Sequence, residues 1–321
     1  MSKKNKKEVI AIACADIHLS AKAPIWRSAE PDWYAAMKRP LKELNNLQEE
    51  YDCPILCAGD IFDQWYGASR KEASELINFA LKYLPDNMYC VPGQHDLPDH
   101  NYEDIGRSAY YTLVQAEKIQ NVLPDVCIDN FLYDNIVLHG FPFGHKLKLL
   151  NKPNEEISIA IIHEYCWIKG HSYPGAPEEN KFGKRKAGID KNNKWLGYDI
   201  VIYGDNHKGF KHQIEDTTIF NCGTLMRRKS DEIGYKPQVG LIYSDGSVEP
   251  HYLDTSLDKH LDVSGLKDAD TELDISSFIE ELSKLGEAAF DFTAAMKQYF
   301  AKNKTNKNVK NVILKAMENR K

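Results

Sequence analysis

Short apolar runs alternate with amphipathic stretches over the first two thirds of the chain. Runs typical of buried strands lie at about residues 8–15, 54–59, 88–92, 135–140, 157–163 and 199–204, followed by shorter ones at about 217–223, 238–244 and 247–253. Helical periodicity predicts helices over about residues 31–50, 69–84 and 106–118. This order predicts an α/β fold with a β-rich closing part, built from two packed sheets with helices outside.

Acidic, amide and histidine side chains follow five of these apolar runs. They form the motifs Asp16-Ile17-His18, Gly59-Asp60 with Asp63, Gly93-Gln94-His95-Asp96, His163, and Gly204-Asp205-Asn206-His207. A single aspartate after a strand often caps the next helix. Five such ends in one chain favour another explanation, because the carboxyl ends of strands in α/β sheets gather around ligands. The pattern predicts a site for divalent cations.

The spacing of these residues suits two ions. Asp16 and His18 can both reach one ion, and Asp60 can bridge two because a carboxylate has two oxygens. Gln94 and His163 would complete the second ion, and Asp205 and His207 can each take one. Such a pair of ions clamps a displacement at phosphorus and lowers the pKa of a bound water. His95 is then the group expected to protonate the leaving oxygen, with Asp96 orienting it.

The chain is expected to divide near residue 255. Residues 1–255 carry the metal motifs, whereas residues 256–321 lose the strand pattern and read as helical. A last helix near the C-terminus places apolar side chains on one face, which suits either packing on its own domain or docking of a partner. The stretch from Glu164 to Trp195 is rich in Gly, Pro, Lys and Asn, and we expect it to overhang the metals.

Composition narrows the class of protein. The chain has 321 residues, 42% hydrophobic and 27% charged, with no apolar run long enough for a membrane span and no signal-peptide pattern. Its seven cysteines are scattered, without CxxC pairs, as expected of reduced thiols in a cytoplasm. The net charge of −6 argues against a simple nucleic-acid binder.

Basic residues nevertheless cluster beside the motifs. Six positive side chains and one negative lie between Lys181 and Lys194, among them Lys184, Arg185 and Lys186, and Arg227 and Arg228 form a second cluster. Both clusters are candidates for contacting a nucleic-acid backbone. A solvated surface is the alternative for the first, and pairing with Asp231 and Glu232 is the alternative for the second.

The motif set resembles the calcineurin-like metallophosphoesterase superfamily over residues 9 to about 252. That family carries DxH, GDxxD, GNHD, a lone His and GHxH, which read here DIH, GDIFD, GQHD, His163 and GDNH. The resemblance implies an αββα sandwich of two sheets with a small C-terminal helical or cap region. It also implies that Asp16, His18, Asp60 and His207 bind the first metal, and that Asp60, Gln94, His163 and Asp205 bind the second.

Two positions depart from the family pattern. Gln94 stands where the family has Asn, and Asp205 stands where it has a histidine ligand. Both keep a donor atom and make the second site richer in oxygen, which favours Mn²⁺, or Mg²⁺, over Zn²⁺. Loss of the second metal is the alternative.

A narrower resemblance links FNCGTLMRRKSDE to the Asn-Pro-Gly-Ser-Leu-x-Arg signature of the SbcD family of DNA repair nucleases, with Cys222 in place of Pro. HEYCWIKGHSYPGAP looks like phage-encoded members, which would act in the host cytoplasm. The resemblance implies a DNA exonuclease and endonuclease that forms a homodimer and works with an SbcC-type ATPase. A phosphatase or small-molecule phosphodiesterase on the same scaffold, or a non-catalytic scaffold, are the alternatives.

Overall fold

The computed structural model describes residues 7–65, 70–124, 136–148, 150, 157–171, 179–182 and 195–261. They belong to one compact unit made of Met1–Ser172 and Pro177–Asp262. The basic cluster Lys184, Arg185 and Lys186 and the C-terminal helices expected after residue 261 lie outside the described residues. The division expected near residue 255 therefore stays a prediction. No helix in the described part of the chain is long and apolar enough to cross a membrane.

The first sheet has six strands in the order β13-β12-β1-β2-β3-β4. Four of them run parallel: β1 (Val9–Cys14), β2 (Ile55–Cys57), β3 (Met88–Cys90) and β4 (Ile119–Asn121). The hairpin β12 (Gln238–Tyr243) and β13 (Val248–Tyr252) adds antiparallel to β1. The first strand of the chain thus lies inside the sheet, with the closing hairpin on one side of it.

The second sheet has five strands in the order β10-β11-β9-β6-β5. Its parallel strands are β5 (Ile136–Phe141), β6 (Ile157–His163), β9 (Ile200–Gly204) and β11 (Thr217–Asn221), and β10 (Phe210–Ile214) is antiparallel to β11. A separate short pair joins β7 (Cys166–Trp167) to β8 (Lys181–Phe182).

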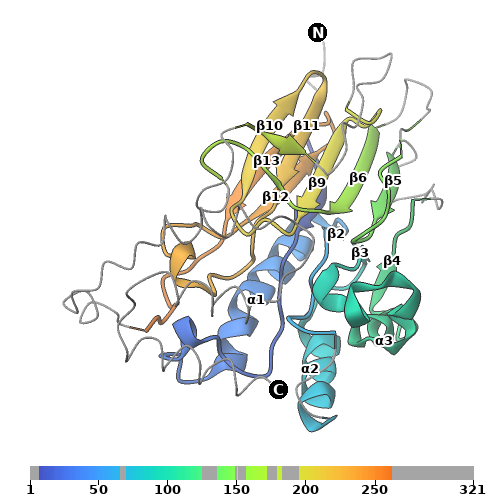
Figure 1. Ribbon diagram of the computed structural model, residues 1–321. Coiled ribbons are helices and arrows are strands. Elements are labelled where there is room, and N and C mark those ends of the chain that lie inside the picture. Colours follow the sequence, from blue (N-terminus) through green and yellow to red (C-terminus); the bar gives the residue numbers. More distant parts are fainter. Residues whose placement is uncertain are drawn as a thin grey trace, which may run out of the picture. The chain divides into compact units, whose positions relative to one another are not determined.

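Side chains of β1 point alternately to the helices on one face of the first sheet and to the second sheet on the other face. Ile12 and Cys14 pack with the helices, whereas Ala11 and Ala13 pack with the inner faces of β5, β6 and β9. The helices α1 (Trp33–Tyr51), α2 (Arg70–Tyr83) and α3 (Ala109–Gln115) cover the outer face of the first sheet (Figure 1). Short 3₁₀ turns lie in the connecting segments: η1 (Ile25–Arg27), η2 (Gln94–Asp96), η3 (Pro98–His100), η4 (Tyr102–Arg107) and η5 (Ser230–Glu232).

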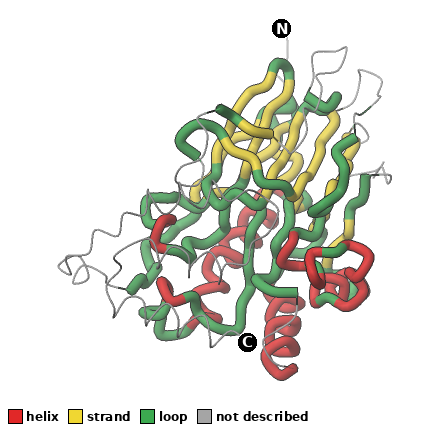
Figure 2. Tube along the Cα trace, viewed as in Figure 1, coloured by secondary structure: helices red, strands yellow, loops and turns green. Residues whose placement is uncertain are grey.

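The outer face of the second sheet is covered by other segments of the chain. Buried Val201 and Tyr203 there pack with Leu150, Trp195 and Phe182 of β8, and in the described ranges no helix lies on this face (Figure 2). The described parts of the 164–195 stretch therefore cover this sheet. The fold is α/β with two parallel-rich sheets, as predicted. In the described residues the helical layer lies on the first sheet.

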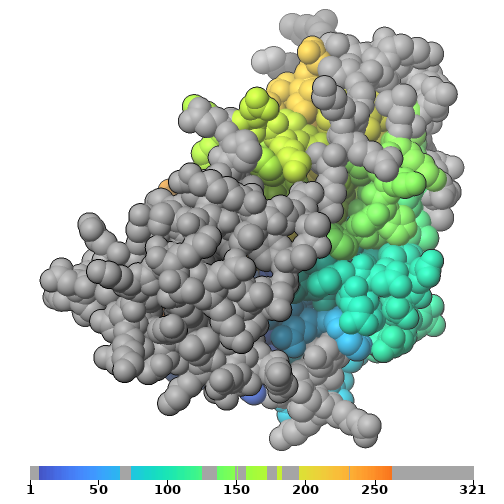
Figure 3. Space-filling model, in the orientation of Figure 1, coloured from blue at the N-terminus to red at the C-terminus, as the bar shows by residue number. Residues whose placement is uncertain are grey.

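The two sheets approach each other at their β4 and β5 edges. A Cβ added to Gly140 of β5 would lie 2.4 Å from the carbonyl oxygen of Val122, so glycine permits this approach. In Figure 3 the teal surface, from the part of the chain around α3, borders the green surface, from the part of the chain around β5 and β6. Because β1, β2 and β3 are parallel neighbours, as are β6 and β9, their carboxyl ends meet along one edge of the sandwich.

Candidate metal centre

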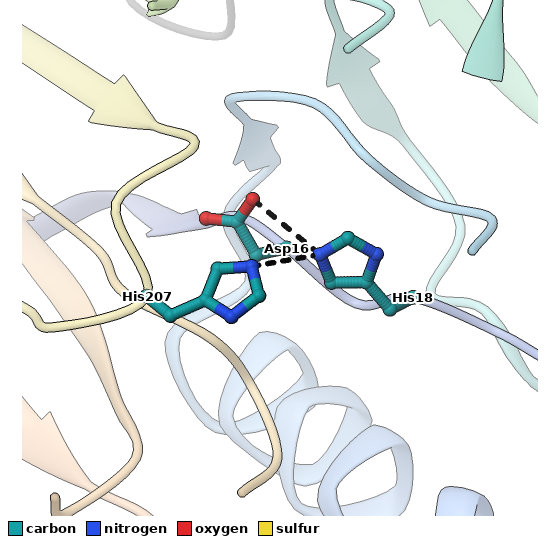
Figure 4. A group of neighbouring side chains, drawn as sticks. All are labelled: Asp16, His18 and His207. Atoms are coloured by element: carbon teal, nitrogen blue, oxygen red, sulfur yellow. Dashed lines mark hydrogen bonds and ion pairs between the residues drawn. The ribbon is translucent and has the colours of Figure 1, made fainter. Parts of the chain in front are cut away.

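Two histidines and an aspartate from different sheets converge at this edge. Asp16 and His18 follow β1, and His207 follows β9. The Nε2 atoms of His18 and His207 are 3.0 Å apart, and His18 Nε2 is 3.9 Å from Asp16 Oδ1. Figure 4 shows one nitrogen of His18 facing both partners. Since two imidazole nitrogens so close can share only one hydrogen, the arrangement suits a cation that accepts both lone pairs.

Asp60, after β2, lies between the histidines of the two sheets. Its Oδ1 accepts a hydrogen bond from the backbone N–H of His95 at 2.9 Å. Its Oδ2 is 3.9 Å from His18 Nε2 and 3.4 Å from His163 Nε2. This oxygen is buried, and no hydrogen bond from the described residues reaches it. A buried carboxylate oxygen without a donor is costly unless a cation accompanies it, so Asp60 fits a bridging ligand.

Gln94, His163 and Asp205 form the other half of the site. His163 Nδ1 donates to the carbonyl oxygen of Ala58 at 2.5 Å, and its Nε2 is 2.7 Å from Gln94 Oε1. The amide nitrogen of Gln94 donates to Asp205 Oδ1 at 2.7 Å. The two residues that depart from the family pattern thus contact each other. Their contact fixes the amide so that its oxygen faces His163.

Every ligand predicted from the sequence lies at this edge. Potential ligand atoms of Asp16, His18 and His207 all lie within 4.8 Å of one another, and so do those of Asp16, Asp60 and His163. A third such group joins His18 and His95 to Asp63. Two of these groups share Asp16, so the candidate ligands form one compact centre. The mixture of carboxylate, amide and imidazole donors suits divalent cations.

The backbone at the site is strained. The φ angles of Asp16, His18, Asp60 and Asp205 are +51°, +50°, +53° and +83°. Residues with a Cβ avoid this left-handed region, and each such residue costs on the order of 1–3 kcal/mol. Four strained residues among seven candidate ligands show that the surrounding fold holds these side chains against a local preference. Strain of this kind collects at functional sites.

Glycines let the strand-end loops come together. A Cβ at Gly59 would lie 2.2 Å from His163 Nδ1, and a Cβ at Gly93 would lie 2.1 Å from Asp60 Oδ1. Both distances are far below a normal contact, and Gly59 also has a φ of +98°. The glycines of the GDxxD and GQHD motifs are therefore required by the approach of the ligands.

Burial and neighbouring charges shift the pKa values of the two carboxylates in opposite directions. Burial raises the pKa of Asp16 from 3.8 to about 7. Burial also acts to raise the pKa of Asp60, but the charge of the neighbouring His163 outweighs it, so that this pKa falls below its ordinary value. Asp16 without a cation therefore holds its proton near neutral pH, whereas Asp60 stays ionised.

The pKa values of the histidines are also shifted in opposite directions. Burial lowers the pKa of His18, and the guanidinium of Arg228 lowers it further. For His163 burial acts in the same direction, but the carboxylate of Asp60 outweighs it and raises the pKa well above 6.5. Glu232 likewise raises the pKa of His207 against its burial. Cations would replace the protons on His163 and His207, because only the neutral ring can coordinate.

His95 and Asp96 lie in the turn after β3. His95 Nδ1 donates to the carbonyl oxygen of Asp63 at 2.8 Å, and its ring centroid is 5.1 Å from that of His18. Asp96 is fully buried and accepts hydrogen bonds from the backbone N–H groups of Ile61, Phe62 and Gly93. The structure therefore places the Asp63 carbonyl on the His95 ring, and Asp96 instead joins the turns that follow β2 and β3.

Three side chains outside the predicted ligand set support it. Glu232 Oε1 accepts from His207 Nδ1 at 2.8 Å, and Arg228 Nη1 donates to Asp63 Oδ1 at 2.6 Å. Asp63 Oδ1 is also 3.6 Å from His18 Nδ1. Glu232 is the third residue after Lys229, and its Oε2 accepts from the backbone N–H of Lys229 at 3.0 Å. That spacing is typical of a residue that caps a turn and does not indicate the contact with His207.

Arg227 points away from this cluster. Its Nη2 donates to Asp258 Oδ2 at 3.3 Å. Asp258 also accepts from fully buried Arg27 at 3.0 Å and from Arg39 at 3.2 Å, and both arginines contact Glu30 at 2.6 Å. We call Arg27, Glu30, Arg39, Arg227 and Asp258 the arginine cluster. The side chains of Arg227 and Arg228 thus contact Asp258 and Asp63, and Glu232 accepts from the backbone N–H of Arg228.

Comparisons with known proteins place this geometry in a family. Solved structures similar to the chain include TT1561 of Thermus thermophilus (12% identity, TM-score 0.43, covering 76% of this chain and 98% of that one). A novel archaeal phosphodiesterase matches at 12% identity with a TM-score of 0.36, covering 77% and 100%. The sulfate thiohydrolase SoxB of Thermus thermophilus matches at 9% identity with a TM-score of 0.42, covering 78% and 57%.

No curated protein matches the chain. The sequence model of the calcineurin-like phosphoesterases matches residues 11–209, which is more than half of the chain. That match contains all five motifs and all seven candidate ligands. The chain belongs to the calcineurin-like phosphoesterase family.

Proposed function

We propose that this protein is a two-metal phosphodiesterase that hydrolyses DNA. The family provides metal-dependent hydrolysis of phosphoesters as the class of reaction. The observation that carries the two-metal proposal is the position of Asp60 Oδ2, without a hydrogen-bond donor, between His18 and His163. Bound there, two divalent ions would supply Lewis-acid stabilisation of charge and a water of lowered pKa.

His95 is the proposed proton donor to the leaving oxygen. A carbonyl oxygen only accepts, so the contact with Asp63 fixes the hydrogen on Nδ1. Nε2 is then the nitrogen that exchanges a proton with substrate. Arg228, held by Asp63, places a positive charge beside His18 and would favour a phosphate at this edge.

The choice of DNA depends on the basic residues and on the resemblance to SbcD nucleases. Arg227 is engaged with Asp258, so we assign backbone contacts to Lys184, Arg185 and Lys186, which lie outside the described residues. We also keep the homodimer and the SbcC-type ATPase partner as proposals. They rest on the same resemblance.

Hydrolysis of three substrates tests the proposal. Bis-p-nitrophenyl phosphate and single-stranded DNA are diesters, and p-nitrophenyl phosphate is a monoester. With Mn²⁺ or Mg²⁺ we expect turnover of both diesters, abolished by chelator, and a lower salt dependence of DNA binding when Lys184, Arg185 and Lys186 are replaced by alanine. Turnover of the monoester alone would mean a phosphatase. Absence of metal-dependent turnover on all three would mean a non-catalytic scaffold.

A further inference from the structure

A hollow of about 390 Å³ lies beside the loop that carries His207. Its lining in the described part of the chain consists of His171, Lys208, Tyr235, Lys236, Gln238, Tyr252 and glycines. None of these described residues is acidic. The volume is within the range of about 300–1,000 Å³ typical of small-molecule pockets. The charge of its wall favours an anionic ligand.

The hollow is attached to the His207 side of the metal centre. Lys208 follows His207 directly in the chain. The side chain of Asn206, the residue before His207, donates to the carbonyl oxygen of His171 at 2.7 Å. His171 Nδ1 in turn contacts the carbonyl oxygen of Gly209 at 3.1 Å. One loop therefore holds a metal-ligand candidate and a wall of the hollow in fixed relation.

The opposite wall is attached to Asp16. Tyr235 Oη donates to the carbonyl oxygen of Cys222 at 3.0 Å. Two residues later, Thr224 Oγ1 donates to the carbonyl oxygen of Asp16 at 3.1 Å. The hollow and the metal centre thus share two supporting segments, which fixes their relative position.

The chemistry of the walls suits a nucleotide. Lys208 and Lys236 provide positive charge for phosphate oxygens. Tyr252 lies on β13 with 57% of its surface exposed, and Lys236 Nζ is 5.9 Å from the centre of its ring. An exposed aromatic ring beside lysines is the combination that binds single-stranded nucleic acids, because bases stack on the ring and the cations hold the backbone.

We propose that this hollow binds a nucleotide that adjoins the scissile phosphodiester. Its phosphate would contact Lys208 and Lys236, and its base would stack on Tyr252. The proposal rests on the proposed DNA hydrolysis and adds the place where the substrate strand is held outside the metal centre.

Two variants test this subsite without touching a candidate ligand. We expect Tyr252→Ala and Lys236→Ala each to raise KM for a short oligothymidylate by about tenfold, a loss typical of one base stack. Turnover of bis-p-nitrophenyl phosphate should stay unchanged, because that diester has no flanking nucleotide. Tyr252→Phe keeps the ring and should restore the KM. Lys211 on β10 is a lysine outside the hollow, and its Nζ is 3.2 Å from Glu249 Oε1. Lys211→Ala is therefore the matched control and should keep the wild-type KM.

A binding measurement in chelator separates this subsite from the activity. Titration with fluorescent oligothymidylate should show about tenfold weaker binding for Tyr252→Ala and Lys236→Ala than for wild type and Lys211→Ala. If wild type does not hydrolyse DNA but the variants still weaken binding, the proposed function fails and the subsite stands. If DNA is hydrolysed and both variants keep wild-type KM and binding, the subsite is overturned. Equal losses on both diesters would also overturn it, since they would indicate distortion of the metal centre.

Discussion

His95 differs from the candidate ligands in what its ring contacts. In both His95 and His163 the Nδ1 atom donates to a backbone carbonyl oxygen, but Nε2 of His163 lies 2.7 Å from the oxygen of the candidate ligand Gln94. We expect His95→Asn to keep both metals and to lower kcat by about 10²–10⁴-fold, the usual contribution of a general acid. Metal content by mass spectrometry and kcat on bis-p-nitrophenyl phosphate test this. His212→Asn, on β10, is the control, and loss of metal from the His95 variant would contradict the role.

Glu232 fixes the orientation of His207. It is buried, and one carboxylate oxygen accepts from the ring while the other accepts from the backbone N–H of Arg228 at 2.5 Å. Glu232→Gln keeps the shape but removes the charge, so His207 becomes a poorer ligand. We expect metal affinity to fall by about 10–100-fold. Titration with Mn²⁺ measures it, and an unchanged affinity would show that His207 needs no such support.

Residues that follow strands could be predicted, and their supports could not. Asp16, Asp60 and Asp205 each come directly after an apolar run, so the local pattern is enough to find them. The partner of Arg228 is 165 positions away in the chain, and the partner of His207 is 25 positions away. Such pairs depend on how the two sheets pack. No local pattern encodes that packing, which is why Asp63 and Glu232 stayed outside the predicted ligand set.

At the scale of elements, the turn after β3 depends on a glycine. Gly93→Ala would bring a methyl group within 2.1 Å of Asp60 Oδ1. We expect a loss of about 1–3 kcal/mol in the free energy of unfolding, as for other overpacked sites, together with weaker metal binding. Gly106→Ala adds a methyl group with no atom within 4 Å and is the control. Urea unfolding of both variants measures this difference in the free energy of unfolding. Equal stabilities would show that the turn can shift to accommodate the added methyl group.

The segment after β13 is held by the arginine cluster. Asp258 accepts from three arginines, one of them fully buried. Asp258→Ala leaves Glu30 as the one acid of the cluster for its three arginines. Removing one partner of a buried ion pair costs about 3–5 kcal/mol in stability. We expect a loss of about 3 kcal/mol in urea unfolding, because Glu30 still pairs with Arg27 and Arg39. Asp254→Ala, at an exposed position in the same segment, should change stability by less than about 0.5 kcal/mol.

The apolar pattern predicted most elements, with clear exceptions. The strand expected at about 8–15 is β1, and the helix expected at about 69–84 is α2. β10 was missed because exposed Lys211 and Gln213 alternate with one buried and two half-buried positions, so that the strand has no apolar run. The third helix begins at Ala109 rather than near 106, because Ser108 caps it by accepting from the N–H of Tyr111 at 3.1 Å.

At the scale of the molecule, the candidate ligands join two sheets. Those that follow β1, β2 and β3 face those that follow β6 and β9. A cation bound by both groups links the sheets in the folded state only. Metal binding should therefore raise the melting temperature, by an amount that grows with metal concentration.

This effect should increase with pH. In the metal-free fold the raised pKa values of Asp16, His163 and His207 mean that protons stabilise these groups. Their stabilising effect is lost as pH rises through those pKa values, whereas cations then bind without displacing protons. We expect the rise in melting temperature with Mn²⁺ to be larger at about pH 8 than at about pH 6. Differential scanning calorimetry tests this. A shift independent of pH would mean that protons and metal do not compete, and Asp60→Asn should remove most of it.

The left-handed backbone conformation of Asp16 sets the stability of the metal-free protein against its catalytic activity. Glycine adopts that conformation without penalty, so exchanging Asp16 for glycine would relieve local tension while removing a carboxylate that burial already disfavours. In the absence of metal, laboratory evolution toward heat resistance alone would therefore favour stable variants that lack this ligand. Only a selection that also demands turnover would keep the aspartate.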